Sequence, residues 1–368
     1  MSLFESFHSK QLQLKNRIVM APMTRARNPN GIPNEMNALY YLQRSDAGLI
    51  ITEGTAISDT AMGVLHIPGL YTAAQTEGWK LVTEAVHKNG AVIFTQLWHV
   101  GRVSHTSIQP NGGKPFGPSD IRANSSAWGY DENGKENFVP CSEPQALTTE
   151  GVGQVVNDFA NAAKNAIVAG FDGVELHGAN GYLIEQFLNP FVNNRTDEYG
   201  GSVENRSRFL LEAIDACIAA IGADKVAIRL TPYGGLNDLP LYDEIETTYQ
   251  YLAAELQKRN IAYIHIMDQQ SRGSFALPKD FMSRFRTWYA GVIVLAGGMS
   301  KGISEQMIAD GSIDLAGFGE PFIANPDLVA RLQNDWPLTA PERHLHYGGG
   351  AHGYTDYPFF ETADVCSA

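Results

Sequence analysis

The chain has 368 residues, of which 44% are hydrophobic and 18% are charged, as in a folded globular enzyme and unlike a disordered or low-complexity protein. Its formal net charge of -13 argues against nucleic acid or an anionic membrane surface as a partner. The three cysteines, Cys141, Cys217 and Cys366, form no CxxC pair, so neither a disulfide framework nor a zinc ribbon is encoded. No apolar stretch reaches the length of a bilayer span and residues 1–10 have no signal-peptide pattern, so a cytoplasmic protein with one domain over residues 1–368 is expected.

Apolar runs and helical periodicity alternate along the chain. We expect buried strands that end near residue 21 and that span residues 48–53, 91–98, 172–177, 225–230, 262–267, 291–296 and 313–318. Helices are expected at residues 34–47, 76–89, 149–167, 206–221, 242–258, 278–286, 304–309 and 326–332. Eight alternations with apolar strands buried on both faces favour a parallel (β/α)8 TIM barrel, although an open doubly wound sheet would show the same alternation.

Two segments depart from this alternation. The residues Leu12, Leu14, Ile18 and Met20 alternate with polar positions around Lys15-Asn16-Arg17, which predicts an N-terminal hairpin leading into the first strand. Residues 99–146, after the third strand, are rich in Gly, Pro, Asn and Ser and are far longer than an ordinary connection. We expect this stretch to form a long excursion over one end of the barrel.

Polar and glycine residues stand where the expected strands end, which is the face of a barrel that carries chemistry. Neutral or cationic hydrogen-bonding groups follow the earlier strands: Thr24, Gln96, His177, Asn180 and Arg229. Gly297, Gly298 and Gly319 follow the seventh and eighth strands, where backbone N–H groups can approach a phosphate. No strand ends in lysine, and carboxylates and histidines are not spaced as metal ligands. The set suits a flat, phosphorylated heteroaromatic cofactor better than a metal.

The stretch from Gly173 to Leu183 concentrates these groups. It reads as a strand, a Gly-rich turn with His177, Asn180 and Tyr182, and a helical segment to Leu188. On an ideal helix His177 and Asn180 would lie about 60° apart and Tyr182 about 140° from His177, so the three would not share a face.

Several separated motifs resemble the old yellow enzyme family of FMN-dependent ene-reductases. They are Ala21-Pro22-Met23-Thr24-Arg25, Thr52-Glu53-Gly54-Thr55, Gln96-Leu97-Trp98, the run from Glu175 to Leu188, the run from Asn194 to Ser202, and Ile228-Arg229-Leu230. The resemblance extends from Lys15 to Pro358, nearly the whole chain, with the motifs in the family's order.

The resemblance implies a non-covalent FMN enzyme that takes electrons from NADPH, or from NADH, and reduces electron-poor alkenes or nitro compounds as a monomer or homodimer. His177 and Asn180 would hold the substrate oxygen, Tyr182 would deliver a proton, and Trp98 and Tyr347 would form pocket walls. The cofactor contacts it implies are Pro22, Met23, Thr24, Gly54, Gln96, Arg229, Gly297, Gly298, Gly319 and Glu320.

Glu320 is the clearest departure from the family. Its members usually end the eighth strand in Gly-Arg, with the arginine on the FMN phosphate, whereas this chain has Gly319-Glu320. A carboxylate cannot replace that contact, so we expect looser FMN binding than in relatives. Val64, where relatives often carry an aromatic residue, and Asn180, a histidine in some of them, bear on substrate range.

Two alternative functions stay open at this point. Gly298-Met299-Ser300-Lys301-Gly302 matches the G-x-S-x-G nucleophile elbow and would support a serine hydrolase with a histidine from the segment 344–352 as base. The second alternative is a barrel that binds flavin but catalyses no reaction. Gly348 to Gly353 matches G-x-G-x-x-G, but no strand leads into it, which indicates a glycine-rich loop.

Overall fold

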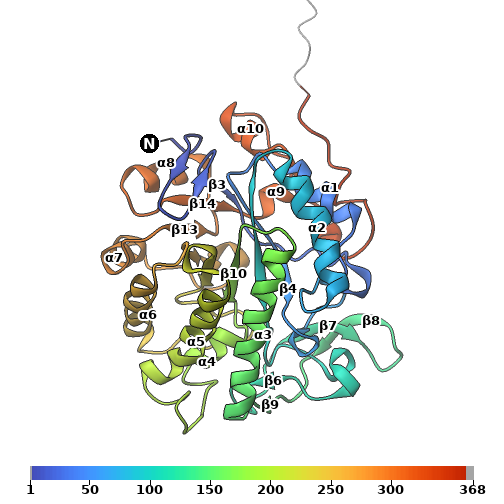
Figure 1. Ribbon diagram of the computed structural model, residues 1–368, viewed down its shortest axis with the longest axis vertical. Helices are drawn as coiled ribbons and strands as arrows, with labels where there is room; N and C mark the ends of the chain where they lie inside the picture. The colour runs from blue at the N-terminus through green and yellow to red at the C-terminus, as the bar shows by residue number, and fades with distance from the viewer. Residues whose placement is uncertain (1, 362–368) are drawn as a thin grey trace, which may run out of the picture.

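A closed barrel of eight parallel strands forms the centre of the computed structural model, which describes residues 2–361, so that Cys366 lies outside the described residues. The barrel order is β10-β11-β12-β13-β14-β3-β4-β5 (Figure 1). These strands are β3 (Ile18–Met20), β4 (Leu49–Ala56), β5 (Val92–Trp98), β10 (Gly173–Gly178), β11 (Val226–Leu230), β12 (Ile264–Met267), β13 (Ile293–Ala296) and β14 (Leu315–Phe318). The (β/α)8 barrel predicted from the alternation is confirmed, and the open sheet is excluded.

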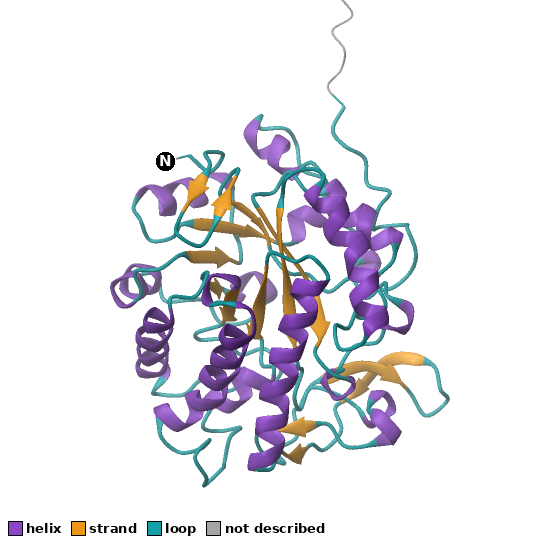
Figure 2. Cartoon of the chain, in the orientation of Figure 1, coloured by secondary structure: helices purple, strands orange, loops and turns teal. Residues whose placement is uncertain are grey.

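Helices surround the barrel, as Figure 2 shows. They are α1 (Glu35–Gln43), α2 (Ala73–His87), α3 (Thr149–Val168), α4 (Leu183–Leu188), α5 (Val203–Ile221), α6 (Ile245–Arg259), α7 (Phe281–Trp288), α8 (Lys301–Ala309), α9 (Glu320–Ala324) and α10 (Leu328–Gln333). Short 3-10 turns are η1 (Pro29–Gly31), η2 (Asp59–Ala61), η3 (Thr106–Ile108), η4 (Pro110–Gly112), η5 (Ala223–Lys225), η6 (Gln269–Arg272) and η7 (Arg343–Leu345). None of the helices within residues 2–361 is long and apolar enough to cross a membrane.

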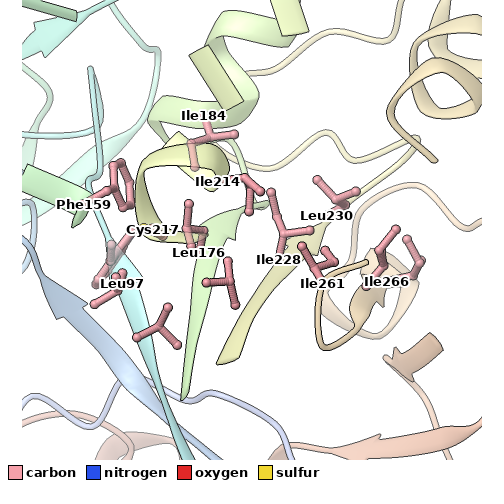
Figure 3. Packing of buried hydrophobic residues seen from close by; sticks show 14 of the residues in the cluster. Leu97, Phe159, Leu176, Ile184, Ile214, Cys217, Ile228, Leu230, Ile261 and Ile266 are labelled. Atoms are coloured by element: carbon pink, nitrogen blue, oxygen red, sulfur yellow. The ribbon is translucent and has the colours of Figure 1, made fainter. Parts of the chain in front are cut away.

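The main core lies between the strands and the helices. Each barrel strand points alternate side chains outward, so Leu176 of β10 and Ile228 of β11 meet Ile214 and Cys217 of α5 (Figure 3). Phe159 of α3 packs into the same layer. The outward apolar face of the strands thus holds the helices in a ring and fixes the barrel that carries the site.

The N-terminal hairpin lies earlier in the chain than predicted. β1 (Phe7–His8) pairs with β2 (Gln13–Leu14), and the turn between them is held by Ser9, whose Oγ accepts the N–H groups of Gln11 and Leu12. The expected turn at Lys15-Asn16-Arg17 is wrong, because the Oδ1 of Asn16 accepts the N–H groups of Ile18 and Gly48 and joins the chain directly to the barrel.

The hairpin covers the amino-terminal end of the barrel. Phe7, Leu12 and Leu14 pack in one cluster with inward-facing side chains of the strands, among them Val19 and Phe94. In Figure 1 the hairpin and the strands β6 to β9 lie at opposite ends of the molecule. The carboxyl ends of the barrel strands are therefore left for the site.

The excursion after β5 contains two small sheets. β6 (Phe116–Gly117) pairs with β9 (Gln145–Ala146), and β7 (Ser126–Tyr130) forms an antiparallel pair with β8 (Glu136–Pro140). Residues 99–146 do cover one end of the barrel, as the sequence predicted, but these strands were not predicted. Helix α9 was also missed, because its five residues are too short for a helical period to be visible.

Candidate active site

One cavity of about 510 Å³ opens at the carboxyl ends of the barrel strands. The structure brings almost all candidate residues from the sequence to its wall: Pro22, Met23, Thr24, Gln96, Trp98, His177, Asn180, Tyr182, Arg229, Gly297, Gly298, Gly319, Glu320 and Tyr347. Val64 lines it too. Residues from eight separate connections thus meet in one place, as the barrel topology requires.

Gly54 is the exception, since it does not line the cavity. It lies buried in β4, beside Gln96 of β5, and a Cβ atom there would stand 2.3 Å from the ring of Trp98. Its place in the site is therefore to leave room for the Trp98 side chain, which does line the cavity.

His177 ends β10 as a neutral hydrogen-bond donor. Its Nδ1 accepts the N–H of Ala179 at 3.3 Å, so the proton of the neutral ring lies on Nε2. Burial, assisted by the charge of Arg229, holds the pKa of His177 well below its ordinary range. The residue can donate to an oxygen in the cavity without carrying charge itself.

Asn180 is held from two sides. Its N–H donates to the Thr231 hydroxyl at 3.0 Å, and its Oδ1 accepts the side-chain amide of Gln269 at 3.0 Å. Asn180 and Gly181 both have positive φ, 58° and 79°, so the backbone turns back sharply after the strand. Since Oδ1 is already engaged, the Nδ2 group of Asn180 is the part left to donate into the cavity.

Tyr182 stands against two other rings of the cavity. Its ring centroid lies 4.8 Å from that of Trp98 and 5.0 Å from that of His177, both in edge-on contact. Burial raises the pKa of Tyr182 above its ordinary range, against an opposing effect of Arg272. The hydroxyl therefore keeps its proton at neutral pH. The segment from His177 to Tyr182 is a strand end and a turn, so the ideal-helix angles expected from the sequence do not apply.

A buried polar group lies inside the barrel at the middle of the strands. The Oε1 of Glu175 accepts the Nε2–H of Gln96 at 2.8 Å, and its Oε2 is bonded to Nδ1 of His265 at 2.9 Å. Burial lowers the pKa of Arg229 to about 10, and Glu175 acts in the opposite direction, so the guanidinium stays charged. With Nε2 of Gln96 held by Glu175, its carbonyl oxygen is left to accept from a ligand.

The loops after β13 and β14 form the other end of the cavity. Gly297 and Gly298 have φ of 106° and 66°, and a Cβ on Gly297 would stand 2.1 Å from the carbonyl oxygen of Asp268. Gly319 precedes α9, and Glu320 is exposed there without an ion pair within residues 2–361. Backbone N–H groups are available to an anion at this end, but the side chain beside them is a carboxylate.

Aromatic residues of the excursion and the C-terminal segment close the outer wall. Trp128 of β7 and Phe138 of β8 stack with centroids 6.3 Å apart, and both line the cavity. Tyr347, which is 46% exposed, stands at the same opening, and the next residue, Gly348, approaches the Trp128 ring. The excursion thus supplies apolar surface for a ligand.

The residues present fit a flavin mononucleotide. The Nε of Arg229 is buried and finds no acceptor within residues 2–361, so a cavity ligand with an acceptor edge would satisfy it. Gln96 offers a carbonyl acceptor at the same cavity, and Gly298, where a Cβ would meet nothing within 4 Å, leaves space for a phosphate against the backbone. No group of three or more His, Cys, Asp or Glu side chains within the described chain could hold a metal ion.

The nucleophile elbow does not assemble a hydrolase. Ser300 is the N-cap of α8, and its Oγ accepts the N–H of Ile303 at 3.4 Å. In the described part of the chain no histidine bonds to Ser300: His344 lies beside Glu342, and His352 bonds to Asp356. A serine without a base cannot act as the nucleophile.

Sequence reasoning missed several residues around the cavity. Gln269 and Arg272 stand in the loop after β12, beyond the first residues that follow the strand, so a search at strand ends stopped short of them. Trp128 and Phe138 come from a hairpin in the excursion, where short strands gave no periodic signal. Glu185 lies in the motif from Glu175 to Leu188, but nothing in the sequence pattern predicted its hydrogen bonds with Gly181 and Thr231.

Comparisons with known proteins agree with this geometry. Residues 2–339 match the family model described as the NADH:flavin oxidoreductase / NADH oxidase family. The chain is 42% identical over 368 residues to 12-oxophytodienoate reductase 1 of Oryza sativa subsp. japonica, covering 98% of this chain and 94% of that protein.

Solved structures are similar over the same length. Morphinone reductase in complex with tetrahydroNAD has a TM-score of 0.95 at 43% identity, covering 99% of both chains. The old yellow enzyme homologue from Zymomonas mobilis has a TM-score of 0.93 at 36% identity, and the match covers 98% of this chain and 100% of that chain. The chain is therefore an oxidoreductase that belongs to the NADH:flavin oxidoreductase / NADH oxidase family, the old yellow enzyme family that its motifs predicted.

Proposed function

We propose that the protein binds FMN non-covalently, takes electrons from NADPH or NADH, and reduces alkenes activated by a carbonyl or nitro group. The observation that carries this proposal is the convergence of His177, Asn180 and Tyr182 on one cavity. Similar proteins have names that denote reductases of 12-oxophytodienoate and of morphinone, and the complex of one of them with tetrahydroNAD supports a nicotinamide reductant. Residues 1–368 act as one unit, as a cytoplasmic monomer or homodimer.

Two donors bind the activating oxygen of the substrate. The Nε2–H of His177 and the Nδ2–H of Asn180 are the free donors of their side chains, because Nδ1 and Oδ1 are engaged elsewhere. Negative charge grows on that oxygen as the alkene is reduced, and fixed donors in a buried site stabilise it. Each donor contributes on the order of 10²-fold to the rate.

Tyr182 supplies a proton to the α-carbon of the alkene. Its hydroxyl is protonated at neutral pH because burial raises its pKa. Its ring rests on Trp98 and His177, which hold it at the wall of the cavity. A positioned acid of this kind contributes about 10² to 10⁴ in rate.

Residues at the strand ends would hold the cofactor. When bound, FMN would supply the hydride chemistry between the nicotinamide and the alkene. Thr24 and Gln96 would bind the edge of the flavin ring, with Pro22 and Met23 as further contacts, and Arg229 would stabilise negative charge on the reduced ring. Gly297, Gly298 and Gly319 would hold the phosphate through backbone N–H groups.

Separate measurement of the two half-reactions tests the proposal. In stopped-flow experiments Tyr182→Phe should keep flavin reduction by NADPH near the wild-type rate and slow oxidation by an enone about 10²-fold or more. Tyr199→Phe, whose hydroxyl bonds to Glu212 away from the cavity, is the matched control. A Tyr182→Phe enzyme that is equally fast with the enone would remove the proton-donor role, and yellow protein that NADPH does not bleach would indicate a non-catalytic flavin carrier.

A further inference from the structure

The 3-10 turn η6 is fastened to the substrate end of the cavity. Gln269, at its start, donates to Oδ1 of Asn180 at 3.0 Å and accepts the N–H of Gly235 at 2.9 Å. Gln269 is 2% exposed, so these bonds are made in a buried place. Ser274 Oγ accepts the same N–H of Gly235 at 3.2 Å and fixes the far end of the turn. The position of η6 is therefore set relative to the oxygen donors.

Arg272 ends η6 at the wall of this cavity. The wall also contains His177, Asn180 and Tyr182. Within residues 2–361, the side chain of Arg272 makes neither a hydrogen bond nor an ion pair, although the chain carries a net charge of -13. Its charge helps to lower the pKa of His177 and acts downward on the pKa of Tyr182, so its field extends to both side chains.

The other arginine of the cavity wall lies in a different environment. Arg229 is 5% exposed and faces the carboxylate of Glu175 inside the barrel, whereas Arg272 is exposed at the rim. Arg284, further along the same connection, is already paired with Glu246 and Asp280. Arg272 is thus the cation of this connection that is free for a ligand of the cavity.

Charge is distributed unequally between the two ends of the cavity. Arg272 follows β12, beside the oxygen donors, whereas Glu320 follows β14, beside Gly319 and two strands further around the barrel. Glu320 is also unpaired within residues 2–361, so it repels an anion there. An anionic group that enters with the substrate is therefore favoured beside Arg272 over the end that carries Glu320.

We propose that Arg272 makes the enzyme selective for activated alkenes that carry a carboxylate, which it binds beyond the oxygen held by His177 and Asn180. The inference rests on the proposed function and names the substrate class of the same site. A guanidinium pairs with a planar carboxylate through two parallel N–H bonds, which adds orientation to charge.

The test compares two maleimides of the same reacting group, N-ethylmaleimide and 3-maleimidopropionate, in the FMN-loaded enzyme. The ratio of their kcat/KM values, acid over neutral, should fall about tenfold in Arg272→Gln. In Arg272→Lys the ratio should lie between those of the wild type and Arg272→Gln, because lysine keeps the charge but cannot form the two parallel N–H bonds. It should also fall with added salt in the wild type and not in Arg272→Gln. Lys279→Gln removes an exposed charge of the same connection that does not line the cavity, and it should leave the ratio unchanged.

An anion at Arg272 could also belong to the phosphates of NADPH, so flavin reduction is measured alone. If Arg272→Gln slows reduction of the flavin by NADPH but leaves the kcat/KM ratio of the two maleimides unchanged, the proposal is overturned. An unchanged ratio in every variant would overturn it as well.

Calorimetric binding of the two saturated products separates this inference from the proposed function. Tighter binding of the acid that is lost in Arg272→Gln supports the carboxylate site even if neither maleimide is reduced, in which case the ene-reductase function fails. Equal binding of both products to wild type and variant contradicts the carboxylate site, whether or not turnover occurs.

Discussion

Replacing Glu185 by glutamine should remove a pH-dependent loss of stability from this protein. Glu185, in α4, is 5% exposed and supports the turn that carries Asn180. Its Oε2 accepts the N–H of Gly181 at 2.6 Å, and its Oε1 accepts the hydroxyl of Thr231 at 2.6 Å. Thr231 in turn accepts the N–H of Asn180. The groups bonded to the carboxyl are hydroxyls and an amide, Tyr249 and Tyr242 are its titratable neighbours, and within residues 2–361 no cation is bonded to it.

The size of the effect follows from the proton that Glu185 holds. Burial raises the pKa of Glu185 from 4.5 to about 7, so between these values the folded state binds a proton that the unfolded state has lost. Stability from this proton is fully present below the unfolded pKa and declines as the pH rises through the folded pKa. Between pH 5 and pH 8 the loss comes to about 2 to 3 kcal/mol, whereas glutamine does not titrate.

Thermal unfolding at pH 5 and at pH 8, with excess FMN present throughout, measures this loss. With about 2.1 cal/mol/K of unfolding entropy per residue, the midpoint of the wild type should fall by about 3 °C relative to that of Glu185→Gln between the two pH values. Glu84→Gln, at an exposed position of α2, controls for the loss of one carboxylate. If the midpoints of the wild type and Glu185→Gln differ by the same amount at both pH values, burial does not raise the pKa of Glu185 and the argument is wrong.

Three further changes address other contacts. Gln269→Leu removes the hydrogen bond to Oδ1 of Asn180. It should lower kcat/KM for an enone about tenfold, while the rate of flavin reduction by NADPH stays unchanged. An unchanged kcat/KM for the enone would show that Asn180 needs no orientation by Gln269. Glu320→Arg should lower the dissociation constant of FMN about tenfold or more but not that of riboflavin, and equal FMN constants for both proteins would remove the predicted effect of the carboxylate. Gly54→Ala places a Cβ 2.3 Å from Trp98 and should reduce the free energy of unfolding by about 1 to 3 kcal/mol in urea, so an unchanged midpoint would refute the close contact.

The barrel and much of the site could be predicted because both follow from local pattern. A parallel strand buried on both faces shows as a continuous apolar run, and the barrel gathers every strand end on one face. Thr24, Gln96 and Arg229 could therefore be assigned to one cavity although they are far apart in the chain. The hairpin shows the limit of this reasoning. Its turn is fixed by the side chain of Ser9, and alternation alone placed it too late.

Residues that depend on tertiary contacts could not be predicted. Gln269 acts only because Asn180 lies 3.0 Å away, a pairing between positions 89 residues apart. Trp128 and Phe138 reach the cavity because β7 and β8 pair within an irregular segment, and neither strand contains the continuous apolar run that marks the barrel strands. From the sequence, Arg272 looks like an ordinary surface charge, because its position at the cavity wall depends on the bonds that hold η6.

The turn between β10 and α4 explains why the three proposed catalytic residues have different tasks. An uninterrupted helix would spread His177, Asn180 and Tyr182 around its circumference, but the positive φ angles of Asn180 and Gly181 fold the chain back instead. A non-glycine residue in this conformation is disfavoured, so contacts from outside the turn must compensate. Gly181 is bonded to Glu185, and Asn180 is held by elements that follow two other strands. The direction of the Asn180 amide is thus set by the barrel as a whole, which predicts that changes behind the turn alter reaction with the alkene while flavin reduction is preserved.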